Sequence, residues 1–164
     1  ASMDFNIKTD PSSPVGDSDY NMQGEVDWDW LVGLVNFNAT AYGSPTLPLT
    51  SNPDNLYFNA LIYGDSTYIN SRILFQFEED EDGDGSFNIS NEDQFGYEII
   101  IEWAGWKLVS IKYSDIEGNG NGGGIHNPDK INKVNMLHLA DPLSGIAKSK
   151  LDYIIFTENE PVNL

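Results

Sequence analysis

The chain has 164 residues, which is the length of one ordinary globular domain. Its 26 acidic residues outnumber its 8 basic residues and give a formal net charge of -18, so the chain lacks the clustered Lys and Arg that nucleic acids and anionic membrane surfaces require. An apolar fraction of 40%, with 12% aromatic residues, is sufficient for a folded core, and the absence of cysteine excludes disulfides and thiolate metal sites.

The first residues, Ala1 to Met3, have neither the charged region nor the apolar region of a signal peptide, and we interpret them as a remnant added ahead of the natural chain. No apolar run approaches the roughly 18–20 residues that cross a bilayer, so we expect no membrane insertion by this domain. No linker divides the chain, and residues 1–164 are therefore predicted to form a single domain.

Short segments in which apolar and polar residues alternate recur along the chain, and clusters of Gly, Asn, Asp and Pro separate them. They predict β-strands near residues 3–8, 19–24, 30–40, 55–63, 70–79, 96–103, 106–113, 132–139 and 151–157. No segment longer than a turn or two carries a helical stripe of apolar residues. The predicted fold class is therefore all-β, an antiparallel β-sandwich of two sheets.

Alternation assigns each strand an apolar face and a mixed face. We expect the apolar faces to form a core that contains Phe58, Ile73, Phe75, Phe77, Ile99, Ile101, Val109 and Ile155. Tyr57, Arg72 and Gln76 then lie on the mixed faces. If such a sheet curves, its mixed face forms a groove in which aromatic rings stack on a sugar and planar polar groups bind the sugar hydroxyls.

Two further candidates for sugar binding are Trp28 and Trp30, which lie two residues apart beside aspartates. An exposed pair of indole rings would provide a stacking platform, and the alternative is that one or both rings cap the core. For Trp103 and Trp106, which flank a predicted turn, we favour the core. Arg72, the only arginine of the chain, either forms a surface ion pair or serves as a fixed fork for sugar hydroxyls or a uronate carboxylate.

The loop at residues 80–93 is acidic and begins with Asp-Glu-Asp-Gly-Asp-Gly, which matches the first half of an EF-hand-type calcium loop. Alternate carboxylates at Asp80, Asp82 and Asp84 can wrap one hard cation with oxygen atoms. The twelfth position, where such loops carry Glu, is Asn91. The sequence therefore leaves two interpretations, a Ca2+ site between strands and a solvated acidic hairpin tip.

Two segments resemble a known family. Residues 105–116, Gly-Trp-Lys-Leu-Val-Ser-Ile-Lys-Tyr-Ser-Asp-Ile, resemble a strand pair of jelly-roll carbohydrate-binding modules with the galactose-binding-like sandwich, including modules similar to family eleven. Residues 151–157, Leu-Asp-Tyr-Ile-Ile-Phe-Thr, resemble the last strand of these modules. The acidic loop together with residues 93–103 is similar to domains of Bacteroidetes surface glycan-binding lipoproteins. The resemblance covers residues 55–157 well and the N-terminal third loosely.

The resemblance implies a jelly-roll fold and a location outside the cell, at the outer face of a bacterial outer membrane. It also implies that Asp152 joins a structural calcium ion together with residues near the N-terminus, for which Asp4 is a candidate by its position; the alternative is that Asp152 is a hydrogen-bonded residue at the start of the last strand. We expect a monomeric domain that is one part of a larger, exported multidomain protein.

The favoured function is non-catalytic binding of a polysaccharide or oligosaccharide, with a β-glucan-type chain as the first choice. Two alternatives stay open. A small jelly-roll glycoside hydrolase or lyase would need only a suitably spaced pair of carboxylates, but no motif marks such a pair, and neither His126 nor His138 has a partner at ligand spacing. A calcium-stabilised structural or adhesion domain would need no glycan at all.

Overall fold

The computed structural model describes residues 3–9, 14, 20–27, 31–67, 71–118, 121–139 and 146–164. Within them the chain forms the strands β1 (Met3–Thr9), β2 (Tyr20–Asp27), β3 (Leu31–Asn38), β4 (Leu56–Gly64), β5 (Ser71–Glu79), β6 (Gln94–Ile101), β7 (Gly105–Lys112), β8 (Glu117–Gly118), β9 (Ile131–Leu139) and β10 (Ile146–Glu158). Short 3-10 helices connect some of them, namely η1 (Ala39–Tyr42), η2 (Pro53–Asn55), η3 (Tyr113–Asp115) and η4 (Pro128–Lys130). No helix of this part of the chain has the length and apolar character to cross a membrane.

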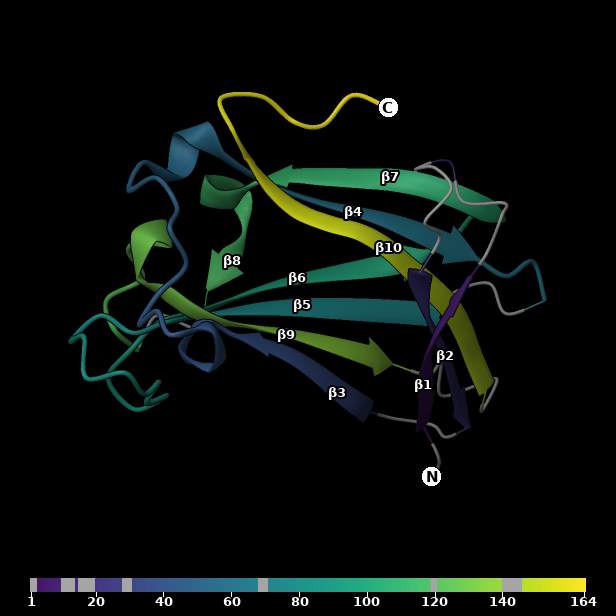
Figure 1. Cartoon of the computed structure of the whole chain (residues 1–164), viewed down its shortest axis with the longest axis horizontal. Helices are drawn as coiled ribbons and strands as arrows, with labels where there is room; N and C mark the ends of the chain where they lie inside the picture. The colour runs from purple at the N-terminus through teal and green to yellow at the C-terminus, as the bar shows by residue number, and fades with distance from the viewer. Residues whose placement is uncertain are drawn as a thin grey trace.

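The strands form two five-stranded sheets that pack against each other (Figure 1). Sheet A has the strand order β1-β2-β10-β4-β7, and sheet B has the order β3-β9-β5-β6-β8. The strand pairs described for both sheets are antiparallel. The predicted fold class, an all-β antiparallel sandwich of two sheets, is confirmed. The two-residue strand β8 was not among the predicted strands, and β10 begins at Ile146 rather than at the predicted residue 151.

The core lies between the sheets and is built on phenylalanine. Phe58 of sheet A contacts Phe75 and Phe77 of sheet B, with ring centroids 4.7 Å and 5.0 Å apart. Tilted and edge-on ring pairs of this kind contribute beyond the apolar area that they bury. Most of the predicted core residues are buried as expected, namely Phe58, Ile73, Phe75, Phe77, Ile99 and Ile101, and Val109 packs against them partly buried.

One core prediction is wrong, because Ile155 is 37% exposed. β10 carries a bulge between Asp152 and Ile155, where the register against β4 shifts and Tyr153 has a φ of 47°. The extra residue reverses the alternation of inward and outward side chains. Phe156, rather than Ile155, therefore contacts Phe58 in the core, with ring centroids 5.5 Å apart.

Part of the outer face of sheet A is covered by the C-terminal segment, residues 159–164 (Figure 1). The Val162 N–H donates to Asn59 Oδ1 at 3.1 Å, and Asn59 is buried although its neighbours in β4 face the core. Trp106 also lies on this outer face, in edge-on contact with Tyr63, so its prediction as a core residue is wrong. The mixed face of sheet A around Asn59 is therefore covered by the protein itself.

Candidate functional site

The outer face of sheet B is a mixed surface in which polar side chains predominate. Because Phe75 and Phe77 of β5 face the core, the residues between them face outward. Strand pairing extends this face over β6 and β9, and it comprises Arg72, Leu74, Gln76, Glu78, Gln94, Gly96, Glu98, Ile100, Lys133, Asn135 and Leu137. Gln76 thus lies between Gly96 of β6 and Asn135 of β9.

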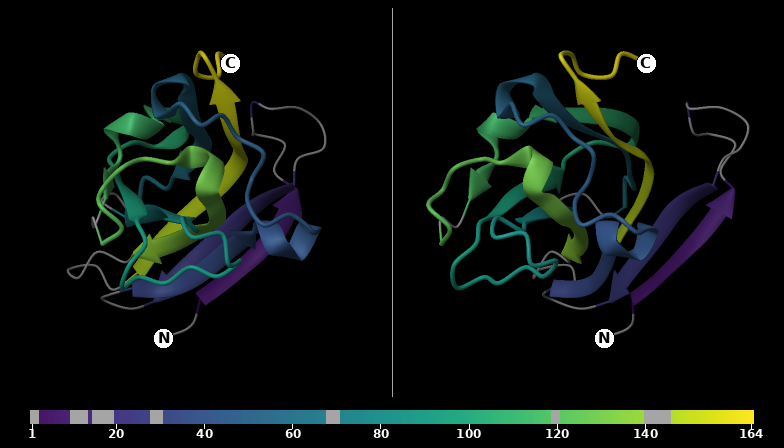
Figure 2. Two further views of the ribbon diagram at one scale, coloured as in Figure 1. Left: turned by 90° about the vertical axis from the view of Figure 1, so that its left-hand side faces the viewer. Right: turned by 60° about the vertical axis from the view of Figure 1, so that its left-hand side comes forward.

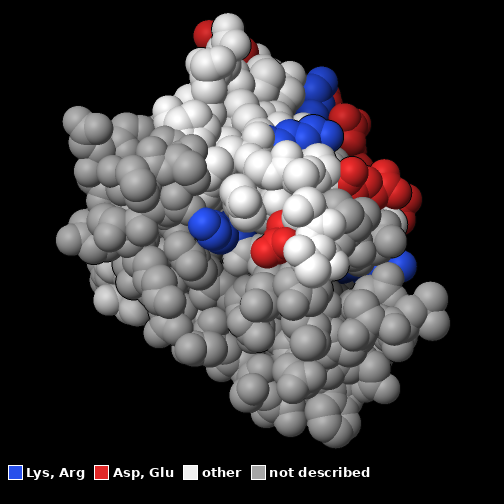
Figure 3. All heavy atoms as spheres, turned by 90° about the vertical axis from the view of Figure 1, so that its right-hand side faces the viewer, with Lys and Arg blue, Asp and Glu red and all other residues white. Residues whose placement is uncertain are grey.

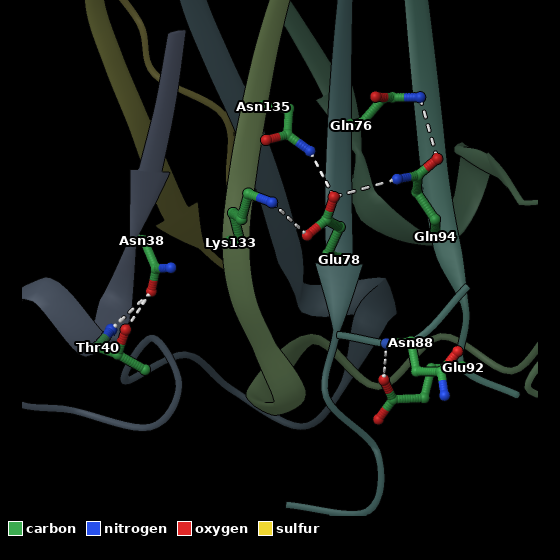
Figure 4. A network of polar contacts seen from close by, with 9 residues as sticks. All are labelled: Asn38, Thr40, Gln76, Glu78, Asn88, Glu92, Gln94, Lys133 and Asn135. Carbon is green, nitrogen blue, oxygen red and sulfur yellow. Dashed lines mark hydrogen bonds and ion pairs between the residues drawn. The ribbon is translucent and has the colours of Figure 1, made fainter. Parts of the chain in front are cut away.

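Glu78 is the centre of a polar network on this face (Figure 4). Its Oε1 accepts hydrogen bonds from the side-chain amides of Asn135, at 2.6 Å, and Gln94, at 3.3 Å. Its Oε2 lies 2.9 Å from the ammonium of Lys133, in an ion pair rather than an aligned hydrogen bond. Gln94 Oε1 accepts in turn from the Gln76 amide at 3.0 Å. Three strands therefore fix planar polar groups relative to one another, and such preorganisation favours binding.

Three buried polar atoms of this face lack a hydrogen-bond partner within the described structure, namely Asn135 Oδ1, Arg72 Nε and Glu78 Oε2, the last of which takes part in the ion pair with Lys133. Asn135 is only 3% exposed. A buried polar atom without a partner costs about 1–3 kcal/mol. Such an atom calls for a water molecule or a ligand group to complete its pairing. The polar groups of this face are therefore held in fixed positions, but not all of their hydrogen-bonding atoms have a partner.

The charged side chains that β5, β6 and β9 place on this face neutralise one another. Arg72 Nη1 lies 2.7 Å from Glu98 Oε1, and these two side chains are 42% and 41% exposed. Lys133 pairs with Glu78 in the same way. Of the two interpretations of Arg72, the structure shows the ion pair. Two acids matched by two bases, in a chain of formal charge -18, make this face suited to a neutral ligand.

The structure separates residues that the sequence analysis grouped as sugar-binding candidates. Arg72 and Gln76 share the outer face of sheet B. Tyr57 is on the outer face of sheet A, because the next residue, Phe58, faces the core. These outer faces lie on opposite sides of the sandwich, so one site on one face cannot contain all three residues. Their binding roles stay predictions.

The predicted tryptophan pair, Trp28 and Trp30, lies outside the described residues. The strand register nevertheless places Leu31, the first described residue after this pair. Leu31 pairs with Leu139 of β9, and Leu139 pairs with Arg72 of β5. The residue that follows Trp30 is therefore in one row with Arg72 on sheet B.

The sequence analysis did not find the partners of Glu78, which are Gln94, Lys133 and Asn135. Alternation within β5 does put Glu78 on the same face as Gln76. The partners come from β6 and β9, and alternation within one strand carries no information on the register between strands. The opposite charges of Lys133 and Glu78 were the available signal, but one lysine has many possible acidic partners in this chain.

The acidic loop brings the three predicted metal ligands together. Asp80, Asp82 and Asp84 each offer a carboxylate oxygen, and these oxygens lie within 4.8 Å of one another. Asp80 is buried and accepts the N–H groups of Gly83 and Gly85, both at 2.8 Å, which closes a tight turn around it. All three ligand atoms are oxygens, which fits a hard cation rather than a soft transition metal. This group could hold a metal ion.

Glu92 closes the same loop from its far end. The Glu81 N–H donates to Glu92 Oε1 at 3.0 Å, and the Asn88 N–H donates to Glu92 Oε2 (Figure 4). Glu92 is buried and stands one residue after Asn91, the twelfth position of the motif. In this structure its carboxylate therefore braces the loop through backbone N–H groups.

We call residues 121–127 the Gly-rich loop, and buried acids anchor it beside the acidic loop, at one end of the sandwich (Figure 2). Asp93 accepts the N–H of Gly122 at 2.8 Å. Glu79 accepts the Tyr113 hydroxyl and the Asn127 N–H, both at 2.9 Å. Burial raises the pKa of Glu79 to about 8, although these hydrogen bonds favour the charged form. The buried carboxyl groups of Glu79 and Asp93 consequently connect the two loops at this end of the sandwich.

Asp152 does not belong to this acidic group. It lies within β10 of sheet A, where its Oδ1 accepts the Tyr153 N–H at 2.7 Å beside the bulge. Asp4 pairs with Glu25, and Glu25 pairs with Lys148, four positions before Asp152 on β10. Four positions correspond to roughly 13 Å along a strand. Asp4 and Asp152 are therefore not neighbours, and metal binding by Asp152 stays a prediction.

No protein-family model matches the chain, and no curated protein matches it significantly. Among solved structures, it is similar to a family 11 carbohydrate-binding module from Clostridium thermocellum in complex with a β-1,3-1,4-mixed-linked tetrasaccharide, with a TM-score of 0.59 and 15% identity over 93% of this chain and 81% of that chain. It is also similar to an arabinose-bound α-L-arabinofuranosidase, with a TM-score of 0.51 and 11% identity over 95% of this chain and 22% of that chain. At these identities the likeness establishes the fold, and it confirms the predicted jelly roll.

Proposed function

We propose that this chain is a non-catalytic carbohydrate-binding module that binds a neutral polysaccharide on the outer face of sheet B. The observation that carries the proposal is the Glu78 network, in which planar polar groups from three strands are fixed relative to one another on the outer face of sheet B. A sugar hydroxyl both donates and accepts, so it can bind the partly exposed members of this network, Gln76, Gln94 and Lys133.

The class of glycan is suggested by the fold and by the apolar residues of the same face. The Clostridium module binds a β-1,3-1,4-mixed-linked tetrasaccharide, so a β-glucan is the first ligand to test. Leu74, which is partly exposed, and Ile100, which is 43% exposed, lie among the polar groups and offer apolar surface to the C–H groups of a sugar ring. Trp28 and Trp30 remain candidates for stacking on such a ring.

Binding without cleavage is supported by the state of the carboxylates. Glu78 and Glu98 each form an ion pair with a basic side chain of the same face. A glycosidase requires a carboxylic acid of raised pKa and a second carboxylate roughly 5–10 Å away. Glu79, whose pKa burial raises to about 8, is buried at the base of the Gly-rich loop. A small glycoside hydrolase or lyase is therefore the weaker candidate.

Isothermal titration calorimetry against soluble glycans tests the proposal. The panel contains mixed-linkage β-glucan, β-mannan, arabinoxylan and a polyuronate. We expect binding heat with at least one neutral β-linked glycan and none with the polyuronate. Reducing ends are measured in the same samples, and their release would support the hydrolase instead. Absence of heat with every neutral glycan would overturn the proposal and leave the structural or adhesion domain.

We also propose that Asp80, Asp82 and Asp84 bind one Ca2+ ion. Three carboxylates with oxygens within 4.8 Å of one another repel each other unless a cation lies between them. A loop of carboxylate and carbonyl oxygens suits calcium, which accepts irregular coordination, better than magnesium, which demands near-octahedral geometry. The ion would stiffen the end of the sandwich where the acidic and Gly-rich loops meet.

We extend the proposal to the biological setting. The module would be a monomeric part of a larger exported protein that captures glycans at the cell surface. The large negative charge supports solubility and weak self-association. Light scattering of the purified chain at increasing concentration tests the monomer, and surface labelling of the producing cells tests the location.

A further inference from the structure

A groove lies at one edge of the sandwich, between β6 of sheet B and β7 of sheet A. Its volume is about 380 Å3, and its lining includes Tyr97, Glu98, Ile100, Trp103, Lys107 and Val109. β8 pairs with β6 only at Phe95 and Gly96, so β8 does not extend along β6 beside the groove. The volume is at the lower end of the range of small-molecule sites.

Two aromatic side chains of the groove are held in place by the core. Tyr97 and Trp103 both pack against the core while remaining partly exposed. The Trp103 indole N–H donates to the Ile62 carbonyl oxygen at 3.3 Å, and the Lys107 ammonium lies 4.6 Å from the indole centroid. Rigid aromatic rings of this kind bind sugar rings with little loss of side-chain entropy.

Polar groups accompany these rings in the groove. Among the described hydrogen bonds none involves the Tyr97 hydroxyl, and burial raises the pKa of this group, so it stays an uncharged donor. Glu98 uses Oε1 for Arg72, which leaves Oε2 as an acceptor. Figure 3 faces the end of the molecule that contains the β6–β7 turn, and there basic and acidic side chains lie side by side along one margin of the described surface. Apart from Lys107, whose ammonium lies over the Trp103 ring, the groove presents aromatic, uncharged and ion-paired groups, a mixture that fits a neutral sugar.

The groove continues the candidate glycan face around β6. One row of paired residues crosses sheet B and runs through Leu31, Leu139, Arg72 and Ile100. This row spans three inter-strand spacings, about 14 Å. Ile100 is 43% exposed and lines the groove, as does Glu98, the partner of Arg72. A glycan that lies across the strands along this row would therefore place one end in the groove.

We propose that the groove is a terminal subsite for one hexopyranosyl unit at the end of the glycan bound on sheet B, with Trp103 as its stacking partner and Tyr97 and Glu98 as its hydroxyl partners. This inference rests on the proposed function. It implies that a chain long enough to reach from Arg72 into the groove binds more tightly than a shorter one.

Calorimetry with mixed-linkage β-glucan oligosaccharides, from the disaccharide to the pentasaccharide, tests the subsite. Trp103→Phe and Tyr97→Phe are compared with Trp106→Phe, which alters a partly buried ring on the outer face of sheet A, and with Tyr42→Phe, which alters an exposed ring; both controls lie outside the groove. We expect wild-type affinity to rise with chain length. Trp103→Phe keeps a smaller ring and should weaken binding of the longest ligand by roughly threefold to fivefold, less than complete loss of a stacking partner, and Tyr97→Phe should weaken it by roughly threefold. The control variants should bind like the wild type.

The outcomes separate this inference from the proposed function. If the wild type binds glycans but Trp103→Phe and Tyr97→Phe match it at every chain length, the subsite is refuted and glycan binding stands. If the wild type binds none of the oligosaccharides or polysaccharides, both proposals fail. Should Trp103→Phe fold poorly, Tyr97→Phe still decides, because it removes a hydroxyl alone.

Discussion

The side-chain amide of Asn135 donates to Glu78 Oε1 at 2.6 Å, and both residues are almost completely buried although they point away from the core. Burial of a carboxylate on the outer face of a sheet is unfavourable unless partners surround it. Here the partners come from three neighbouring strands, so the carboxylate has a fixed orientation in the middle of the candidate glycan face.

Replacing Asn135 should therefore affect both binding and folding. We expect Asn135→Ala to weaken the affinity for the neutral glycan by roughly tenfold, equivalent to about 1.4 kcal/mol, and to lower the free energy of unfolding by about 1–3 kcal/mol, because the buried Glu78 carboxylate loses a donor. Calorimetry and thermal unfolding measure the two effects. Asn163→Ala, in the exposed C-terminal segment, is the matched control. Equal affinity of both variants and the wild type would show that the glycan does not use this network.

The ion pair between Lys133 and Glu78 should behave as a buried pair. The two side chains are 28% and 7% exposed, so Lys133→Met leaves a poorly hydrated carboxylate and should cost about 2 kcal/mol of unfolding free energy. Adding Glu78→Gln should restore part of this loss, as a double-mutant cycle in urea would reveal. Arg72→Met, which breaks the more exposed pair with Glu98, should cost less than about 1 kcal/mol. Strictly additive effects at Lys133 and Glu78 would contradict the coupling.

Calcium removal should destabilise the chain. We expect a chelator to lower the melting temperature by roughly 5–10 °C, since an ion at about a hundred times its dissociation constant contributes about 2.7 kcal/mol. Asp82→Asn combined with Asp84→Asn should abolish the response, whereas Asp115→Asn, an exposed acid outside the loop, should preserve it. If neither the chelator nor added calcium changes the melting temperature of the wild type, the acidic loop is a solvated acidic hairpin tip rather than a calcium site.

His138 should make the fold sensitive to mild acid. Burial lowers its pKa to about 4 from the ordinary 6.5, so the folded state resists protonation that the unfolded state accepts. The stabilisation is complete above about pH 6.5 and is lost as the pH falls from there toward about 4, with a total of about 3 kcal/mol. His138→Leu should show a smaller decline of unfolding free energy between about pH 7 and about pH 5 than the wild type. Parallel declines would exclude His138 as the cause.

Gly64 should tolerate no side chain. A Cβ atom there would lie 2.0 Å from the Trp103 carbonyl oxygen and 2.8 Å from Ile101 Cγ2. Since a backbone atom cannot move aside cheaply, Gly64→Ala should cost about 3 kcal/mol in chemical unfolding. Gly96→Ala is the matched control, because its nearest neighbour would be Leu74 Cδ1 at an ordinary 3.5 Å. Similar stabilities of the two variants would refute this explanation.

The alternation of apolar and polar residues, and the spacing of residues within a loop, predicted those features that depend only on neighbours in the sequence. Alternation identified Phe75 and Phe77 as core residues because β5 is regular throughout. The three aspartates of the acidic loop lie within five residues, so their spacing alone brings them together. Alternation failed at Ile155, because a bulge is an insertion that period two cannot reveal.

The pairing of the strands, and the register within each pair, could not be predicted from the sequence. Tyr57 and Gln76 have similar surroundings in the sequence, yet β4 enters one sheet and β5 the other. The contact of Glu78 with Asn135 joins residues 57 positions apart and depends on the register of β5 against β9. One sequence contains no direct signal for such a register when several strands have similar patterns.

The bulge divides β10 into two segments, and the residues that face the core are odd-numbered in the first segment and even-numbered in the second. Before it, the odd-numbered Leu151 faces the core, and after it the even-numbered Phe156 does so. Deletion of one residue at Tyr153 or Ile154 would remove the bulge and make the pairing of β10 with β4 regular. Deletion elsewhere in β10 would turn the core-facing side chains of one segment to the outer face of the sheet. Related sequences should therefore differ in the length of this strand at these two positions before they differ anywhere else in it.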